Sequence, residues 1–223
     1  MLAVIEQRII DGSLRAGDRL PGERELAEML AVSRNSVREA LRALESMGIV
    51  VRGPGRGPNS GCIVTRRPGD ALGSLLRLHL ALSHFSLADL VDIRVQLESQ
   101  AVRQCANQGL GLQDAHIESL IERMGDESLS PSEFNLLDTQ FHIAVSKASG
   151  NPLLIALMQA LRHAVQREMV SASERLTQWS PVALLLRDEH QAIADAVRAG
   201  EASAAATLME AHIRGFYRGD MAS

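Results

Sequence analysis

Cysteine is scarce in this sequence of 223 residues, which contains only Cys62 and Cys105, far apart and outside any CxxC spacing. Two such cysteines make neither a disulfide framework nor a cysteine metal site, so we expect packed thiols in a reducing cytoplasm. No apolar run approaches the roughly 20 residues that cross a bilayer, and residues 1–11 have the pattern of an amphipathic helix rather than a secretory signal. These absences favour a cytoplasmic protein without membrane contact.

Lysine is also nearly absent, since Lys147 is the only one and arginine carries the remaining positive charge. The net charge of -4 gives no case for nucleic-acid binding by the chain as a whole. However, residues 1–68 hold eleven Arg and eight Asp or Glu, a balance of +3, which leaves -7 for the rest. A basic N-terminal part on an acidic body suggests that the N-terminal part contacts nucleic acid.

The first 66 residues have the order of a winged helix-turn-helix domain. Apolar spacing predicts helices over 1–11, 23–30 and 34–47, with Ser33 as the N-cap of the third helix and Gly48 as its end. Short apolar runs at 49–51 and 62–64 flank a loop at 53–61 that is rich in Gly and Pro, which predicts a hairpin.

The third predicted helix carries polar and basic residues on its outer face near its start, as a helix that enters the major groove requires. Arg can grip guanine and Asn can grip adenine, each through two hydrogen bonds, while Ser can bond to phosphate. The alternative interpretation is a solvated helix face. The candidate DNA contacts are Arg24, Ser33, Arg34, Asn35, Ser36, Arg38, Arg56 and Gly57.

Beyond a linker and connecting helix at 67–85, the sequence predicts an all-helical domain over 86–218. Proline and glycine residues divide it into segments. The predicted fold is mainly α: a winged helix-turn-helix domain followed by an all-α antiparallel helical bundle. Helices are expected near 70–83, 86–108, 112–125, 131–149, 152–178, 182–199 and 201–217.

Asp138 and His142 are four residues apart and therefore share one helix face, while His190 and His212 lie on two further helical segments. One carboxylate and three imidazoles suit a divalent transition metal such as zinc, nickel or manganese. We expect one ion per chain. On a six-coordinate ion, four protein ligands leave two positions for a bidentate carboxylate.

Two stretches give a more specific indication. Residues 17–27 read GDRLPGERELA and residues 32–41 read VSRNSVREAL. Both resemble the DNA-binding domain of the GntR family closely in spacing and residue type. Gly22 replaces the usual Ser or Ala, and loop 53–61 is longer than the usual wing. The resemblance implies a homodimer on a pseudo-palindromic DNA operator.

Residues 72–217 resemble the FCD domain of the FadR branch of that family. The matching stretches are Asp92 to Glu98, Leu137 to His142, Gly150 to Leu153, Glu189 to Ile193 and Met209 to Ile213. The resemblance implies a helical bundle around one cavity, with a metal on Asp138, His142, His190 and His212. It also places Arg94 at the cavity, where it would clamp a small carboxylate effector. Glu98 and His163 are further candidate effector contacts.

Three function classes follow from these patterns. The first is a transcriptional regulator, most simply a repressor, that responds to an organic acid. The second is a metal-dependent enzyme with a DNA-binding domain, which the absence of an HExxH motif disfavours; Glu189 precedes His190 and should point away from the metal. The third is a purely structural metal without an effector. Arg94 has its own alternative, a pair with Glu98 four residues on.

Overall fold

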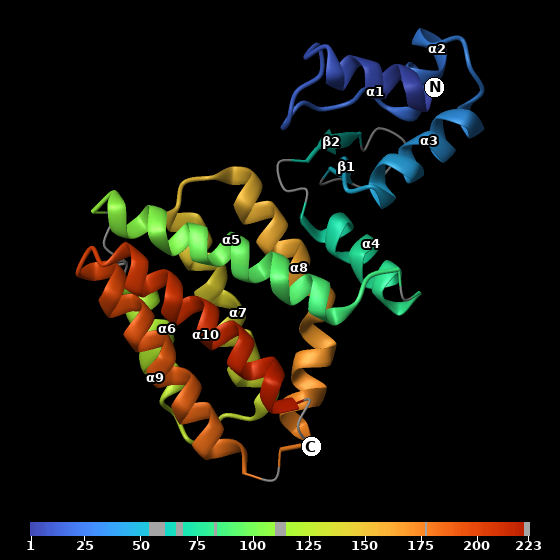
Figure 1. Ribbon diagram of the computed structural model, residues 1–223. Helices are drawn as coiled ribbons and strands as arrows, with labels where there is room; N and C mark the ends of the chain where they lie inside the picture. Colours follow the sequence, from blue (N-terminus) through green and yellow to red (C-terminus); the bar gives the residue numbers. More distant parts are fainter. Residues whose placement is uncertain (54–60, 66–68, 83, 110–114, 177, 221–223) are drawn as a thin grey trace. The chain divides into compact units, whose positions relative to one another are not determined.

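The computed structural model describes residues 1–53, 61–65, 69–82, 84–109, 115–176 and 178–220 (Figure 1). The chain forms two compact units, Met1–Leu72 and Gly73–Ser223. Their division falls inside helix α4 (Gly69–Ala81), within the segment that the sequence assigns to the linker and connecting helix. The predicted mainly helical fold, with one small hairpin in the N-terminal unit, is confirmed.

The N-terminal unit, called the head below, packs three helices and a hairpin around one apolar core. Ile5 of α1, Leu26 of α2 and Leu44 of α3 are buried together with Val50 of β1. The order of elements is that of a winged helix-turn-helix domain. Its elements are α1 (Leu2–Ile10), α2 (Glu23–Met29), α3 (Arg34–Ser46), β1 (Val50–Arg52) and β2 (Cys62–Val64).

The ends of α3 follow the sequence prediction. The Ser33 side chain accepts a hydrogen bond from the Ser36 backbone N–H at 3.1 Å, which satisfies one of the free donors at the helix start. Gly48 takes a φ of 68°, and a Cβ there would lie 2.8 Å from the Ala71 side chain, so both backbone and space require glycine. Ala31, in the turn between α2 and α3, takes a φ of 52°, which is uncommon for a residue with a side chain.

The hairpin pairs β1 with β2 in antiparallel register, with Val50 opposite Val64 and Arg52 opposite Cys62. Arg19 forms a bridge to Ile63 on the other side of β2, so the segment before α2 extends this small sheet. The loop between the strands includes Arg56 and Gly57, and both residues lie outside the described residues.

The C-terminal unit, called the body below, is an all-helical bundle. Helix α10 lies along α5 and also contacts α9, while α7 packs against α8, α6 and α5 (Figure 1). A single continuous apolar core fills the space between them. The helices after α4 are α5 (Leu87–Asn107), α6 (Ala115–Met124), α7 (Pro131–Ala148), α8 (Pro152–Glu174), α9 (Trp179–Arg198) and α10 (Ala202–Asp220).

Local sequence fixes the starts of the helices that matter for the site. Ser130 and Glu133 form a reciprocal capping box at α7, and Asn151 caps α8 through its side chain. The prediction for α8 and α9 was wrong at their junction: α8 ends at Glu174 and α9 begins at Trp179. Pro181 lies within the first turn of α9 and not before the helix. A missing N–H costs nothing in the first turn, because the N–H groups there have no partner within the helix.

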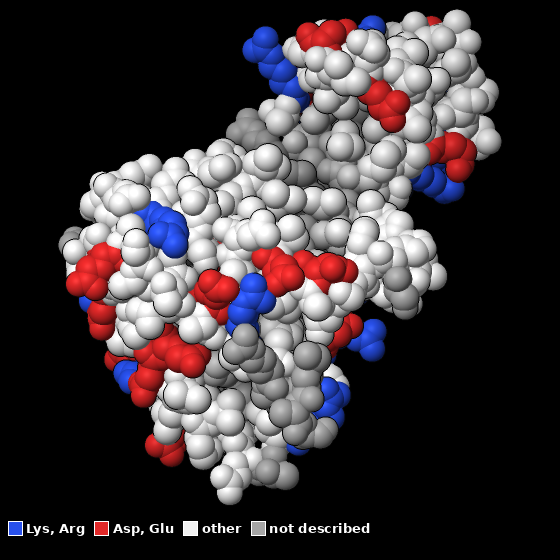
Figure 2. Space-filling view, viewed as in Figure 1, with Lys and Arg blue, Asp and Glu red and all other residues white. Residues whose placement is uncertain are grey.

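On the face of the body that Figure 2 shows, acidic and basic side chains are interspersed. Arg198 pairs with Glu118 of α6 at 2.6 Å, and Arg214 pairs with Asp92 of α5 at 2.8 Å. Exposed pairs of this kind contribute little to stability, so the apolar core holds the bundle. Within the described residues, no helix is long and apolar enough to cross a membrane.

Candidate functional site

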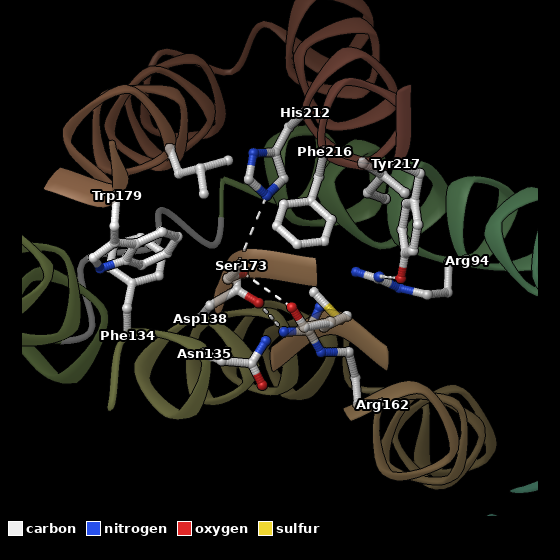
Figure 3. A pocket seen from close by; sticks show the side chains of 13 residues that line it. Arg94, Phe134, Asn135, Asp138, Arg162, Ser173, Trp179, His212, Phe216 and Tyr217 are labelled. Atoms are coloured by element: carbon white, nitrogen blue, oxygen red, sulfur yellow. Dashed lines mark hydrogen bonds and ion pairs between the residues drawn. The ribbon is translucent and has the colours of Figure 1, made fainter. Parts of the chain in front are cut away.

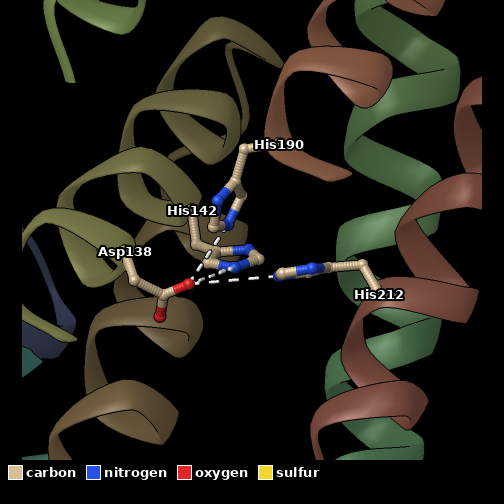
Figure 4. A group of neighbouring side chains, drawn as sticks. All are labelled: Asp138, His142, His190 and His212. Carbon is tan, nitrogen blue, oxygen red and sulfur yellow. Dashed lines mark ion pairs between the residues drawn. The ribbon is translucent and has the colours of Figure 1, made fainter. Parts of the chain in front are cut away.

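Four buried side chains converge in the body, from three helices (Figure 4). Asp138 and His142 come from α7, His190 from α9 and His212 from α10. The Asp138 Oδ1 atom lies 3.4 Å from His142 Nε2, 3.1 Å from His190 Nε2 and 3.9 Å from His212 Nε2. The four residues are brought together as the sequence analysis expects.

The cluster fits a divalent metal. Donors that sit about 2.0–2.2 Å from one ion lie about 3–4.4 Å from each other, and one donor atom from each of the four residues lies within 4.8 Å of the others. His142 Nε2 and His190 Nε2 are buried and have no hydrogen-bond partner within the described part of the chain. Unsatisfied buried nitrogens are costly, and an ion would give both a partner.

Two glutamates hold the outer nitrogens of two of the three histidines. His212 Nδ1 lies 2.7 Å from Glu189 Oε2, and His142 Nδ1 is paired with Glu98 Oε2. Carboxylates at this position orient a ligating imidazole and leave its other nitrogen free for the ion. Glu189 therefore reaches the outer side of the cluster, in keeping with the expectation that it points away from the metal.

The electrostatics favour the protonation states that metal ligands need. Burial, together with the neighbouring His212, lowers the pKa of His190 to about 3, and burial lowers the pKa of His212. Burial alone would raise the pKa of Asp138, but the Arg162 guanidinium and then His142 outweigh it, so this pKa lies well below its ordinary value. Neutral imidazole and ionised carboxylate are the forms that bind a metal.

Two buried arginines flank the cluster. Arg162 of α8 pairs with Asp138 Oδ2 and donates to Thr139 Oγ1 at 3.0 Å. Arg94 of α5 donates to Glu98 Oε1 at 2.9 Å and to the Tyr217 hydroxyl at 3.0 Å. Burial opposes both charges of the Arg94–Glu98 pair. At Arg94 the carboxylate of Glu98 outweighs the effect of burial and raises the pKa of the guanidinium. At Glu98 the neighbouring His142 and Arg94 outweigh the effect of burial and lower the pKa of the carboxyl group.

Both arginines line one small cavity beside Asp138 and His212 (Figure 3). Its volume is about 20 Å³, roughly the space of one water molecule. Arg162 Nε and Nη1 are buried without hydrogen-bond partners among the described residues, so they are donors available to an anion. The other lining residues are Phe134, Asn135, Met169, Ser173, Trp179, Leu186, Ile213, Phe216 and Tyr217.

Two predicted effector contacts need correction. His163 is exposed and packs against Gly73 of α4 instead of lining the cavity, because neighbouring helix positions project about 100° apart and Arg162 takes the inward direction. Glu98 is buried, but its two oxygens face Arg94 and His142, so it supports the site from behind. The Arg94–Glu98 pair, considered as an alternative, is present, yet Arg94 also lines the cavity.

Arg162 and the aromatic residues of the cavity were not among the site residues predicted from the sequence. A signal for Arg162 does exist: it lies on the same face of α8 as the apolar residues Met158 and Val165, and an arginine that is buried on such a face needs a partner. No comparable signal marks Phe216 or Tyr217, because an aromatic residue on an inward helix face is normally part of the core.

The head presents the predicted DNA contacts on α3 and α2. The Arg34 and Asn35 side chains are exposed and make no hydrogen bond or ion pair with any other residue that the structure describes. Arg38 lies 3.3 Å from Glu23 Oε2, and Arg24 lies 3.7 Å from Glu28 Oε1. The Ser33 and Ser36 hydroxyls lie 2.9 Å apart at the start of α3, so they serve the cap before any phosphate.

Comparison with known proteins gives matches to both units. Residues 2–58 match the family "Bacterial regulatory proteins, gntR family", and residues 89–215 match the family "FCD domain". The solved structure of a GntR protein from Streptococcus agalactiae aligns over 98% of this chain and 97% of its own, with a TM-score of 0.63 and 24% identity. That structure supports the fold.

Three curated relatives are similar over most of this chain. An Escherichia coli K12 protein, provisionally named as the regulatory protein of the L-lactate dehydrogenase operon, is 30% identical over 92% of this chain and 79% of its own. The Glc operon transcriptional activator of the same strain is 35% identical over 70% of this chain and 62% of its own. The Bacillus subtilis regulator LutR is 28% identical over 92% of each chain.

All of these relatives are transcriptional regulators rather than enzymes, which removes the metal-dependent enzyme from the candidate functions. The winged helix-turn-helix head, the helical body and the two family matches agree with one another. The chain therefore belongs to the GntR family of bacterial DNA-binding transcriptional regulators and carries an FCD domain.

Proposed function

We propose that this regulator is a repressor of the FadR branch whose operator affinity falls when a small hydroxy carboxylate binds in the body. The observation that carries the proposal is the convergence of a metal-ligand cluster and two buried guanidinium groups on one cavity. Metal ligands beside arginines form a site for a carboxylate, because both kinds of group attract its oxygens.

Asp138, His142, His190 and His212 would hold one zinc, nickel or manganese ion per chain. When bound, the ion supplies positive charge that can accept an oxygen of the acid. Arg162 contributes Nε and Nη1, which lack protein partners within the described residues, to a second oxygen. Arg94 is held by Glu98 and Tyr217 on the same cavity, so its position is fixed before the acid arrives.

The class of effector follows from the polar groups and from one relative. A hydroxyl beside the carboxylate would give a bidentate pair of oxygens, which suits an ion with two positions free. The relative named for the L-lactate dehydrogenase operon is connected with a 2-hydroxy acid, which supports the same class for this chain. A sugar acid or a dicarboxylate, each of which has more polar groups, would bind in the same way and is included in the proposal.

In the head, Arg34 and Asn35 would read base edges in the major groove, while Arg24 and Arg38 contact the DNA backbone. Ser33, Ser36 and the wing residues Arg56 and Gly57 complete the proposed surface. One head covers a short half-site, so two heads of a homodimer would read a pseudo-palindromic operator. Acid binding can alter DNA affinity only if it favours one placement of the two heads over another.

The test is a binding measurement with the full-length protein. An operator is first selected from random duplexes, and its affinity is then measured by fluorescence anisotropy with zinc-loaded protein, with and without L-lactate. We expect the acid to weaken binding at least about fivefold, the lower end of usual coupling between sites. A His142→Ala, His190→Ala double variant serves as the control and should lose this response.

A purely structural metal gives a different result. Metal removal would then unfold the body, and no hydroxy acid, sugar acid or dicarboxylate would change either the melting temperature or the operator affinity. That outcome would refute the effector proposal and leave the DNA-binding function intact.

A further inference from the structure

An apolar groove opens beside the buried cavity, between the end of α8 and the facing sides of α9 and α10. Its volume is about 270 Å³, and Ala172, Leu176, Val182 and Leu185 form much of its lining. Glu189 and Ser173 are the polar side chains in that lining. An apolar hollow of this size on a monomer surface commonly marks a binding site.

The groove and the buried cavity share part of their walls. Ser173, Leu186 and Phe216 line both. In Figure 3 the Phe216 ring lies between the His212 and Tyr217 side chains, and its centroid is 5.4 Å from that of Tyr217. Phe216 is only half-buried, and its ring belongs to the wall that the cavity and the groove share.

The two volumes limit what can bind. A chamber of about 20 Å³ holds roughly one water molecule, so it cannot enclose an organic acid as it stands. A carboxylate placed at Arg162 needs more space than the cavity holds, and displacement of the Phe216 ring, which lines both spaces, would let the rest of the acid extend toward the groove. The groove offers mainly carbon surface there, and Glu189 and Ser173 are its polar side chains.

From this arrangement we infer that the groove takes the hydrocarbon tail of the effector, whose carboxylate lies at the metal and arginine cavity. The effector is then a hydroxy acid with an apolar tail, and Phe216 is the side chain that yields to it. This inference rests on the proposed function, since the groove receives the tail of the acid only if the cavity receives its carboxylate. Each methylene buried in the groove strengthens binding about fourfold.

Gly215 allows the groove to be filled without disturbing the cavity. It lines the groove but not the cavity, and a Cβ built on it meets no atom within 4 Å. The Gly215→Leu variant therefore adds a side chain to the wall of the groove at a position where the Cβ fits, and leucine favours the helix over glycine. The matched control is Ala204→Leu, an exposed position on the same helix.

The experiment measures dissociation constants by calorimetry for glycolate, 2-hydroxybutanoate and 2-hydroxyhexanoate with zinc-loaded full-length protein. In the unaltered protein and in Ala204→Leu, affinity is expected to rise from glycolate to 2-hydroxyhexanoate by at least about tenfold. In Gly215→Leu, glycolate should bind as before and the rise should vanish.

Glycolate has no apolar tail, so it distinguishes failure of the tail site from failure of the proposed effector site. If it binds but affinity stays flat or falls along the series, the tail site is refuted and the proposed effector site survives. If no acid binds, glycolate included, the proposed function fails and the tail site fails with it. If the rise persists in Gly215→Leu while sedimentation shows altered association, the groove is a contact between copies of the chain and the inference is overturned.

Discussion

Glu189 Oε2 lies 2.7 Å from His212 Nδ1, and this contact leaves His212 Nε2 directed at Asp138 Oδ1, 3.9 Å away. The glutamate side chain is 35% exposed, whereas the histidine is buried. A residue at the surface thus sets the orientation of an imidazole inside the bundle. The contact gives a means of weakening the proposed metal site without removing a ligand.

The Glu189→Gln variant should bind metal about 10–100-fold more weakly, the usual effect of losing such a partner. The fold should be unaffected, since the side chain is partly solvated and similar in size. Competition with a chromophoric chelator measures the affinity. The exposed Glu122→Gln change is the control, and equal affinity in the two variants would mean that Glu189 does not orient His212.

The Asp138–Arg162 pair predicts a stability effect that does not depend on metal. In metal-free protein, Asp138→Ala leaves the buried Arg162 guanidinium without its carboxylate, which typically costs about 3–5 kcal/mol. Trp179 is the only tryptophan of the chain and packs edge-on against Phe134, so its fluorescence follows unfolding of the body alone. Urea unfolding followed at Trp179 measures the change.

The double variant Asp138→Ala, Arg162→Met tests the reason for that loss. Methionine fills part of the arginine volume without a charge, so most of the lost stability should return. Metal binding should stay lost, because the carboxylate ligand is still missing. If the double variant is as unstable as Asp138→Ala alone, the lost stability comes from packing and not from the unpaired charge.

Arg34→Ala should weaken binding to the selected operator by about 1–3 kcal/mol, the typical contribution of an arginine that grips a base edge. Binding to random DNA should change far less, because Arg34 would read sequence rather than phosphate. Arg103→Ala, an exposed position on α5, removes the same charge from the body and serves as the control. An equal loss on operator and random DNA would make Arg34 a phosphate contact.

Ser33→Ala should destabilise α3 by about 1 kcal/mol, because it removes the side chain that accepts from the Ser36 N–H. Hydrogen exchange of the first α3 amides detects this change locally. Ser46→Ala, at an exposed serine near the other end of the same helix, is the comparison. Equal exchange in both variants would show that the cap is not needed.

The sequence predicted the cluster of one aspartate and three histidines because its signal is local and chemical. Asp138 and His142 share a helix face by spacing alone, and the histidines on α9 and α10 stand in stretches that resemble a known domain. Element boundaries were less predictable, since Pro181 can stand before a helix or inside its first turn. Arg162 and His163 show the same limit: pattern places both on α8, but only packing decides which one turns inward.

The groove beside the cavity was outside the reach of sequence reasoning. Its lining comes from the region of Leu176 and Val182 and, further along the chain, from Gly215, and each of these residues alone looks like ordinary core or surface. A space between helices depends on how the side chains of three helices meet, and no single helix pattern records that.

Elemental analysis of the purified full-length protein, beside the His142→Ala, His190→Ala double variant, tests the central claim most directly. We predict close to one equivalent of zinc, nickel or manganese per chain in the native protein and almost none in the variant. A native protein that holds no metal after incubation with each of these ions would contradict the account, because the four converging residues would then be only a polar part of the core.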